Sequence, residues 1–495
     1  MNDDSEACEE LASRLEAPVV NAWVRAQLGT MDTGDERRNE RLATLLAAVA
    51  QRPGQSLPSQ CETAAPLKAA YRLLECEKLL PADLIASAGH ATTTMLQQRQ
   101  ADGVLLCVQD TTTLNFSTHD SLEGRGSIGN HPKFLGFHAH STLLMGEAGV
   151  VHGLLDCEVY ARDGLKLQAR VPGERNRQPV AQKESQRWLR SFAASAQLCS
   201  VLPQVEAVVN VADREADMYE LFIEVARHQQ EQAGRVHLLV RAQHNRELEG
   251  NEQRLWAHLE GLPAQGSWEV ELPSAKGIHG TQKRVVEAVW GSVELAVPVF
   301  QKKYKKHEQA IPLQVIRVSE PEPPSGMEPL EWVLLTTWPV PSAQEARRVV
   351  GWYAKRWQIE VLHRIWKSGC AVEQRRLQDT RSTQVMIVLD LLVAVMLLGL
   401  VSKSRLEPEA STEGWLTPEQ CTVLRTKFES VKTKTAGRPL SIAQAVRWIS
   451  QLGGHRGAPS SPPPGAEALW RGIIRLQDLT QGWLLANTCT NAGKR

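Results

Sequence analysis

The first hundred residues place apolar side chains three or four positions apart, which is the spacing of amphipathic helices. In one predicted helix, between Gly34 and Pro53, the apolar positions are Leu42, Leu45, Leu46 and Val49. Three basic residues stand on the preceding turns: Arg37, Arg38 and Arg41. A second helix is predicted around residues 65–80. This part of the chain therefore predicts a small helical domain that carries an arginine-bearing helix.

From about residue 101, short apolar runs replace the helical spacing. The run GVLLCVQ ends in Asp110 and the run VVNVA ends in Asp213, as buried strands followed by an acidic residue would. Two further strands are predicted within 137–162, and helices within 182–195 and after Asp213. Because strands and helices alternate here, the segment predicts an α/β core.

The second half of the chain begins with strands and continues with helices. Residues 236–340 hold several strand-like runs separated by Gly, Pro and polar turns, and a long helix is predicted over 342–368. The predicted organisation is a helical domain over 1–95, an α/β domain over 96–375 with a β-rich insertion at about 240–340, and a helical domain over 376–495.

One apolar run, Val385–Val401, imitates a membrane span. It carries Asp390 near its middle and is shorter than the ~20 residues that a bilayer needs, so a buried helix is the favoured interpretation. The acidic N-terminus lacks a basic start followed by an apolar core, so it does not read as a secretory signal.

Composition and charge narrow the class of protein. The hydrophobic fraction of 42% and the charged fraction of 23% are those of a soluble globular chain. With 56 basic and 56 acidic residues, there is no global positive field, so affinity for nucleic acid must come from local patches. Nine scattered cysteines without a CxxC pair argue against a disulfide framework or a structural zinc site and suit a reducing cytoplasm.

Two strand ends deliver the candidate catalytic acids, Asp110 and Asp213. Such positions hold a short acidic side chain rigidly between apolar walls. With a third carboxylate, they could bind two divalent cations such as Mg²⁺ or Mn²⁺, which activate a nucleophile for attack on a phosphodiester. Each aspartate could instead be a turn or cap residue, and Asp213 could simply cap the helix that follows it.

The predicted helix 342–368 supplies the third carboxylate, Glu360. At about 100° per residue, Arg356, Tyr353 and Lys367 fall about 40° or less from Glu360, so the four share a stripe about 60° wide. A solvated charged face is the alternative. The stripe favours a site in which Arg356 and Lys367 hold phosphates beside a metal bound by Glu360.

The segment WYAKRWQIEVLHRIWK resembles the Y-(2)-R-(3)-E-(6)-K signature of insertion-sequence DDE transposases of the bacterial cut-and-paste type. The segments VQDTTTLNF and VADREAD resemble those around the first and second catalytic aspartates of that family. The resemblance covers nearly the whole chain. It implies an RNase H-like mixed-sheet core with a β-rich insertion, flanked by an N-terminal helical domain that binds transposon ends and a C-terminal helical domain that dimerises.

The resemblance also implies roles for the candidate residues. Asp110, Asp213 and Glu360 would hold two Mg²⁺ ions, for which Mn²⁺ may substitute. Further residues would contact DNA: Tyr353, Arg356, Lys367, Trp332, Arg241, Arg37, Arg38 and Arg41. Trp332 would take up a flipped base, although a core position on a strand is an equally good interpretation.

The activity implied is cut-and-paste transposition: 3′-end nicking, hairpin formation and resolution, and strand transfer into target DNA, with two protomers pairing two inverted repeats. Two alternatives stay open. One is a metal-dependent RNase H-like nuclease without strand transfer. The other is a DNA-binding regulator that does not cut, which the presence of all three acids disfavours.

Overall fold

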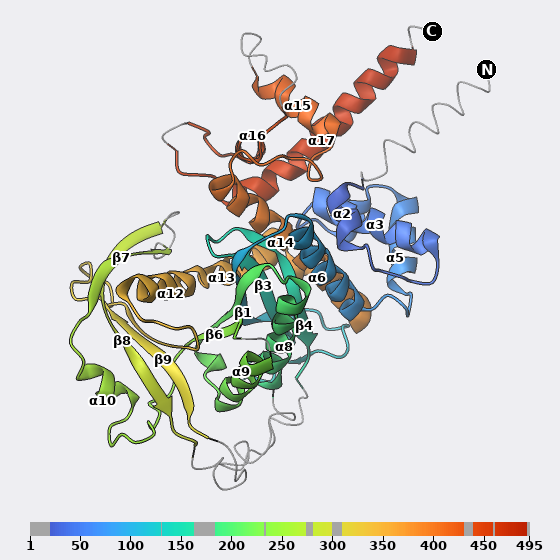
Figure 1. Ribbon diagram of the computed structural model, residues 1–495. Helices are drawn as coiled ribbons and strands as arrows, with labels where there is room; N and C mark the ends of the chain where they lie inside the picture. The colour runs from blue at the N-terminus through green and yellow to red at the C-terminus, as the bar shows by residue number, and fades with distance from the viewer. Residues whose placement is uncertain are drawn as a thin grey trace.

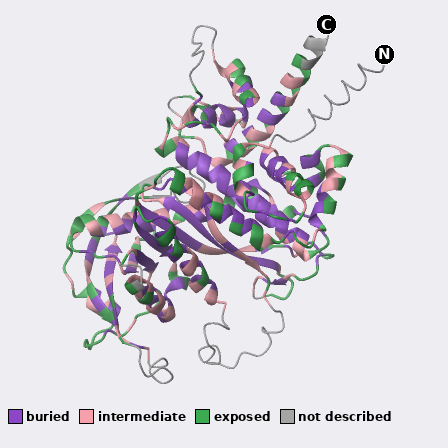
Figure 2. Ribbon diagram, turned by 45° about the vertical axis from the view of Figure 1, so that its right-hand side comes forward, coloured by how far each residue is buried: buried purple, intermediate pink, exposed green. Residues whose placement is uncertain are grey.

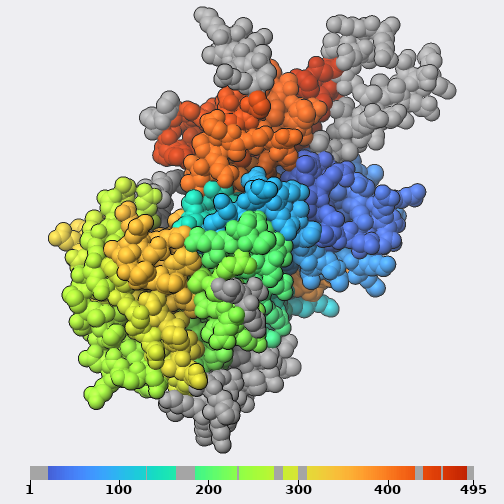
Figure 3. All heavy atoms as spheres, viewed as in Figure 1, coloured from blue at the N-terminus to red at the C-terminus, as the bar shows by residue number. Residues whose placement is uncertain are grey.

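The computed structural model describes residues 20–129, 131–162, 184–231, 234–273, 281–298, 309–429, 439–458 and 461–492. A central sheet carries helices on both faces, with the N-terminal helices at one end and the C-terminal helices above them (Figure 1). The space-filling view in Figure 3 shows the same three regions as adjoining bodies in blue, green to yellow, and orange to red.

The described N-terminal region is helical, as predicted. Its helices are α2 (Ala22–Gln27), α3 (Glu36–Gln51), α4 (Leu57–Cys61), α5 (Ala64–Leu74) and α6 (Pro81–Gln98). Helix α3 begins where the Asp35 side chain accepts a hydrogen bond from the backbone N–H of Arg37 at 2.8 Å. Its predicted apolar face, from Leu42 to Val49, is buried.

One mixed sheet runs through the centre of the chain in the order β2-β3-β1-β5-β6-β10-β9-β8-β7, with β4 added beside β3. Its strands are β1 (Gly103–Asn115), β2 (Gly126–Ser127), β3 (Leu135–Gly146), β4 (Val151–Tyr160), β5 (Val205–Ala212), β6 (Val236–Arg241), β7 (Gly266–Pro273), β8 (Thr281–Leu295), β9 (Ile311–Ser319) and β10 (Glu331–Thr336). Strand β1 pairs antiparallel with β3 and parallel with β5, and β5 pairs parallel with β6. This confirms the predicted α/β, RNase H-like fold class.

The β-rich insertion continues this sheet rather than forming a separate one. Strand β10 pairs antiparallel with β6, joining Leu334 to Arg241, Leu335 to Val240 and Thr336 to Leu239. The periodicity of the sequence predicts the strands but not their partners, because pairing at the edge of a sheet depends on contacts between residues far apart in the chain.

Side chains of the central strands alternate between two hydrophobic cores, one on each face of the sheet. On β1, Leu106 and Val108 enter the core that contains α12, α13 and α14, whereas Leu105 and Cys107 enter the core of α8 and α9. Burial on both faces explains the nearly continuous apolar run before Asp110.

The second core is covered by α8 (Gln186–Val201) and α9 (Tyr219–Glu231), with α10 (Leu255–Glu260) near the insertion. The first core is covered by α13 and by α14 (Thr380–Leu406). Helix α14 is long and apolar enough to cross a membrane, but 94% of its most apolar window is buried inside the protein. Figure 2 shows this helix buried through most of its length. The prediction of a buried core helix is therefore confirmed.

The predicted long helix 342–368 is interrupted. It consists of α12 (Ala343–Lys355), a turn at Arg356, α13 (Trp357–Arg364), and a π-helical turn η4 (Ile365–Gly369). Short 3-10 turns stand at η3 (Arg214–Ala216) and η5 (Val372–Gln374). Arg356 keeps helical backbone angles and contacts both Tyr353 and Glu360, so these three residues share one stripe. The π-helical turn follows them and changes the angular position of Lys367.

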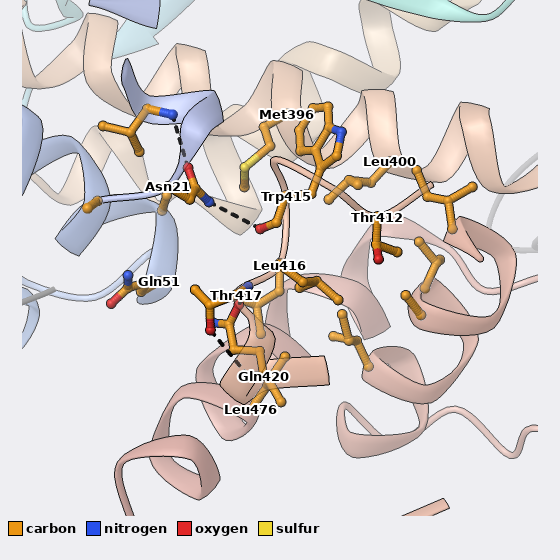
Figure 4. A pocket seen from close by; sticks show the side chains of 18 residues that line it. Asn21, Gln51, Met396, Leu400, Thr412, Trp415, Leu416, Thr417, Gln420 and Leu476 are labelled. Atoms are coloured by element: carbon orange, nitrogen blue, oxygen red, sulfur yellow. Dashed lines mark hydrogen bonds between the residues drawn. The ribbon is translucent and has the colours of Figure 1, made fainter. Parts of the chain in front are cut away.

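The C-terminal helices are α15 (Pro418–Phe428), α16 (Ile442–Leu452) and α17 (Ala466–Ala492). Together with α2, α3 and α14 they line a mainly apolar pocket (Figure 4). At its rim the Asn21 side chain donates to the backbone oxygen of Trp415 at 3.1 Å. The pocket is a junction between the two ends of the chain and contains none of the candidate acids.

Candidate active site

Asp110 and Asp213 leave the sheet side by side. Val108 of β1 is paired with Val211 of the parallel strand β5, and the two aspartates stand two residues beyond this pair. By the alternation of the strands, both point to the face that packs against α13. Asp213 also accepts a hydrogen bond from the N–H of Glu215 at 2.9 Å, so it caps the turn η3 as well as facing Asp110.

Glu360 reaches this place from α13, with Arg356 one turn earlier. The Arg356 guanidinium lies 2.5 Å from the Glu360 carboxylate and 3.7 Å from that of Asp110. The side chains of Arg356, Glu360 and Asp110 are 16%, 31% and 19% exposed, so solvent reaches each of them in part. Residues separated by about 250 positions in the sequence thus converge on one arginine.

Burial, together with the nearby negative charge of Asp213 and Glu360, raises the pKa of Asp110 to about 7. The backbone N–H of Thr111 partly offsets this by donating to Asp110 at 2.8 Å. The negative charges of Asp213 and Glu360 near Asp110 are thus only partly neutralised by Arg356. Such an excess of negative charge favours the binding of a cation.

The donor atoms fit a divalent metal ion, because carboxylate oxygens are hard ligands of the kind that Mg²⁺ prefers. Within the ranges that the structure describes, however, no three His, Cys, Asp or Glu side chains lie close enough to share one ion. Here the Arg356 guanidinium lies between Asp110 and Glu360. A metal held by these acids therefore requires Arg356 to release Glu360.

Tyr353 and Trp332 form one aromatic pair beside the acids. Their rings meet edge to face at 4.9 Å, and the Arg356 guanidinium lies 5.9 Å from the Tyr353 ring. Both side chains are largely buried, and burial raises the pKa of Tyr353. The sequence left open whether Trp332 is a core residue or takes up a base. In the structure it is a core residue that packs against the Tyr353 ring.

Arg241 ends β6 on the same face of the sheet. Its guanidinium donates to the backbone oxygen of Glu331 at 2.9 Å. Burial lowers the pKa of Arg241, and a hydrogen bond with Tyr353 acts in the opposite direction. The structure thus places Arg241 beside Tyr353, through contacts that join β6, β10 and α12.

Lys367 lies farther along, on the π-helical turn. Burial lowers its pKa, and Glu373 acts in the opposite direction. Glu373 in turn accepts from the backbone N–H of Asn115 at the end of β1, at 2.8 Å. Lys367 is thus linked through Glu373 to the end of β1 at Asn115.

The three arginines of α3 do not share one environment. Arg37 and Arg41 are exposed. Arg38 is half-buried, donates to the backbone oxygen of Thr33 at 3.2 Å and lies 3.7 Å from Asp35. Arg37 and Arg41 are therefore available to a ligand, whereas Arg38 also stabilises the start of its helix.

The sequence analysis missed Asp217, whose side chain is fully buried four residues after Asp213. It accepts from the N–H groups of Gln243 and His244 and binds the Arg246 guanidinium at 2.8 and 2.5 Å. These contacts tie the turn after β5 to the turn after β6. The signal in the sequence was a second aspartate in VADREAD, which looks like one more exposed charge until its partner is known.

Three buried histidines have lowered pKa values, and we therefore expect the protein to lose stability as the pH falls. Burial lowers the pKa of His140 and His363 to about 3 and that of His152 to about 4. The unfolded chain binds a proton at each one below pH ~6.5 but the folded chain does not, so stability present above that pH is lost as the pH falls toward 4.

The test compares the free energy of urea unfolding at pH 7 and pH 5 for the wild type and His140→Phe. Each buried histidine contributes up to about 1.4 kcal/mol per pH unit. The loss between the two pH values is expected to be about 2 kcal/mol smaller in the variant. Equal losses in the two proteins would contradict this account. Taking the difference cancels the opposite contribution of Asp110, whose raised pKa favours the folded state at lower pH.

Comparisons with known proteins give two family matches. Residues 20–79 match the family described as "Transposase DNA-binding", and residues 186–396 match the family described as "Transposase DDE domain". The first match contains α3, and the second contains Asp213 and Glu360, while Asp110 lies before it.

Among solved structures, the chain is similar to a piggyBac transposase in a synaptic complex with hairpin DNA, determined by cryo-EM. The sequence identity is 11%, the TM-score is 0.37, and the alignment covers 95% of this chain and 78% of that chain. A likeness this distant carries no weight for the site.

Proposed function

We propose that this chain, which contains a transposase DNA-binding domain and a transposase DDE domain, catalyses cut-and-paste transposition of an insertion sequence. The observation that supports the proposal is the convergence of Asp110, Asp213 and Glu360 from β1, β5 and α13 on one face of the sheet. Three carboxylates on rigid elements form the kind of site that phosphoryl transfer needs.

The cofactor in this proposal is Mg²⁺, two ions per site, with Mn²⁺ as a substitute. Bound ions would activate water or a 3′-hydroxyl and stabilise the leaving oxygen of the phosphodiester. The ligands would be Asp110, Asp213 and Glu360. The remaining residues orient DNA: once Arg356 releases Glu360, its guanidinium is placed to bind a phosphate beside the acids.

The partner in this proposal is double-stranded DNA, first the inverted repeats of the element and then the target. Arg37 and Arg41 expose guanidinium groups on α3 for end binding. Tyr353, Lys367 and Arg241 would hold the strand near the acids. Nicking, hairpin formation and resolution, and transfer would use the same acids in turn, within a homodimer that pairs two ends. Trp332 would take a flipped base only if Tyr353 moved from its ring.

The test is a strand-transfer assay with a precleaved transposon end, a supercoiled target plasmid and Mg²⁺ or Mn²⁺. Transposition predicts insertion products joined through the 3′-end of the substrate. A nuclease without strand transfer would cut intact ends but give no joined product. A regulator would bind ends and give neither result. Either of these outcomes would refute the proposal.

A further inference from the structure

A buried hydrogen bond between Ser141 and His363 lies next to the candidate active site. Ser141 Oγ and His363 Nε2 are 3.0 Å apart, although the residues are separated by 222 positions in the sequence. Ser141 is completely buried, and His363 is 7% exposed. The bond joins strand β3 to helix α13 in the interior of the protein.

Each end of this bond adjoins one of the acids. Ser141 is the cross-strand partner of Asp110 in the β1–β3 pair, so their side chains leave the same face of the sheet. His363 follows Glu360 by three residues on α13, which places the two about one helical turn apart. The distance between Asp110 and Glu360 therefore depends on how α13 is held against β3.

The His363 imidazole is neutral, because burial and the positive charges of Lys367 and Arg356 lower its pKa to about 3. A neutral imidazole and a hydroxyl form a directional contact that adds no charge to the group of acids. The opposite face of the same strands carries a second pair, Thr111 Oγ1 and His140 Nδ1 at 2.9 Å. That second pair stabilises β1 against β3 but does not reach α13.

We infer that His363, acting through Ser141, is a positioning residue: it holds α13 against β3, so that Glu360 stays near Asp110 and the two carboxylates can bind divalent metal together once Arg356 releases Glu360. Apolar packing of Ile359 and Leu362 fixes which face of α13 is buried but is not directional along the helix. The hydrogen bond supplies the directional contact. This inference rests on the proposed function, because it concerns how the same acids bind metal.

The test uses His363→Leu, His363→Gln, Ser141→Ala and the double variant His363→Leu/Ser141→Ala. Binding of Mn²⁺ is measured by calorimetry in the absence of DNA, and cleavage is measured across a range of Mg²⁺ concentrations. The two single variants that lose the hydrogen bond are each expected to weaken Mn²⁺ binding by on the order of tenfold, since groups behind the ligands typically have effects of this size. Saturating Mg²⁺ is expected to restore much of the cleavage in these variants.

The double variant is expected to bind Mn²⁺ no more weakly than either single variant, because both substitutions remove the same bond. His363→Gln presents an amide nitrogen near the position of Nε2 and is expected to restore most of the affinity. Ser402→Ala is the matched control. Ser402 is also buried and accepts from the N–H of Val151 at 3.1 Å, but on α14. This control is expected to lose stability without a change in Mn²⁺ affinity.

Wild-type affinity in both His363→Leu and Ser141→Ala would overturn the inference while leaving the proposed function intact. An effect of Ser402→Ala as large as that of Ser141→Ala would also overturn it, because general destabilisation would then explain both. Ser141→Ala removes a single oxygen atom and serves as the deciding variant if His363→Leu does not fold. A wild-type protein that binds no Mn²⁺ and cleaves no DNA would refute the proposed function, and this inference with it.

Discussion

Replacing Glu360 by glutamine is expected to lower metal-dependent DNA cleavage by on the order of 10³-fold or more, as the loss of an essential catalytic group does in other enzymes. Glutamine keeps the size of the side chain but removes the negative charge that a metal ion requires of its ligand. Binding of the transposon end is expected to persist, because Glu360 is a metal ligand in the proposal and the predicted end contacts include Arg37 and Arg41 on α3. Cleavage assays and gel-shift titrations on the same end fragment measure the two effects.

The control is Glu224→Gln on α9, on the other face of the sheet, where Glu224 pairs with Arg227. This variant is expected to cleave at the wild-type rate. Normal cleavage by Glu360→Gln, or by Glu360→Ala, would contradict the assignment of Glu360 to the catalytic site. An equal loss in the control would point to general damage instead.

Replacing Arg375 by methionine is expected to destabilise the protein by about 3–5 kcal/mol, the usual cost of leaving one member of a buried ion pair without its partner. Arg375 is 6% exposed and binds the fully buried Asp390 at 2.7 and 2.5 Å. It also donates to Gln55 and Gln60 of the N-terminal region. The substitution therefore leaves the buried carboxylate of Asp390, on α14, without its partner. It also removes the hydrogen bonds that link Arg375 to the N-terminal region.

Chemical denaturation of the wild type and the variant measures this effect. The double variant Arg375→Met/Asp390→Leu is expected to recover much of the loss, because it removes both charges from the interior. Lys283→Met is the matched control, since Lys283 pairs with Glu269 at the surface with side chains 62% and 54% exposed. A change of about 0–1 kcal/mol is expected there. Arg375→Met as stable as this control would contradict the prediction.

The positions of the two aspartates could be predicted from the sequence, because each follows a buried strand in which side chains alternate between the two faces of the sheet. Asp110 and Asp213 follow apolar runs long enough to be buried strands, and the two strands are parallel neighbours. The shared face of Asp110 and Asp213 follows from the period of two along each strand. Asp390 could likewise be recognised as incompatible with a membrane span, although its partner Arg375 could not.

The rest depended on contacts between distant segments. A regular helix over 342–368 predicted one stripe for Tyr353, Glu360 and Lys367, but a π-helical turn begins between Glu360 and Lys367. Arg356 was predicted to hold phosphate, and nothing in the sequence indicated that its guanidinium pairs with Glu360 and Asp110, as it does in the structure. Ser141 and His363 carry no motif, and only the packing of β3 against α13 brings them together.

The pairing of β6 with β10 has a mechanical consequence. Because the insertion strands extend the sheet that carries the acids, swinging them open as a lid would separate Leu334 from Arg241 and Leu335 from Val240. It would also leave N–H and C=O groups of interior strands without partners. The sheet from β4 to β7 is thus expected to move as one body. Under the proposed function, DNA is therefore expected to reach the acids without a hinge opening between β6 and β10.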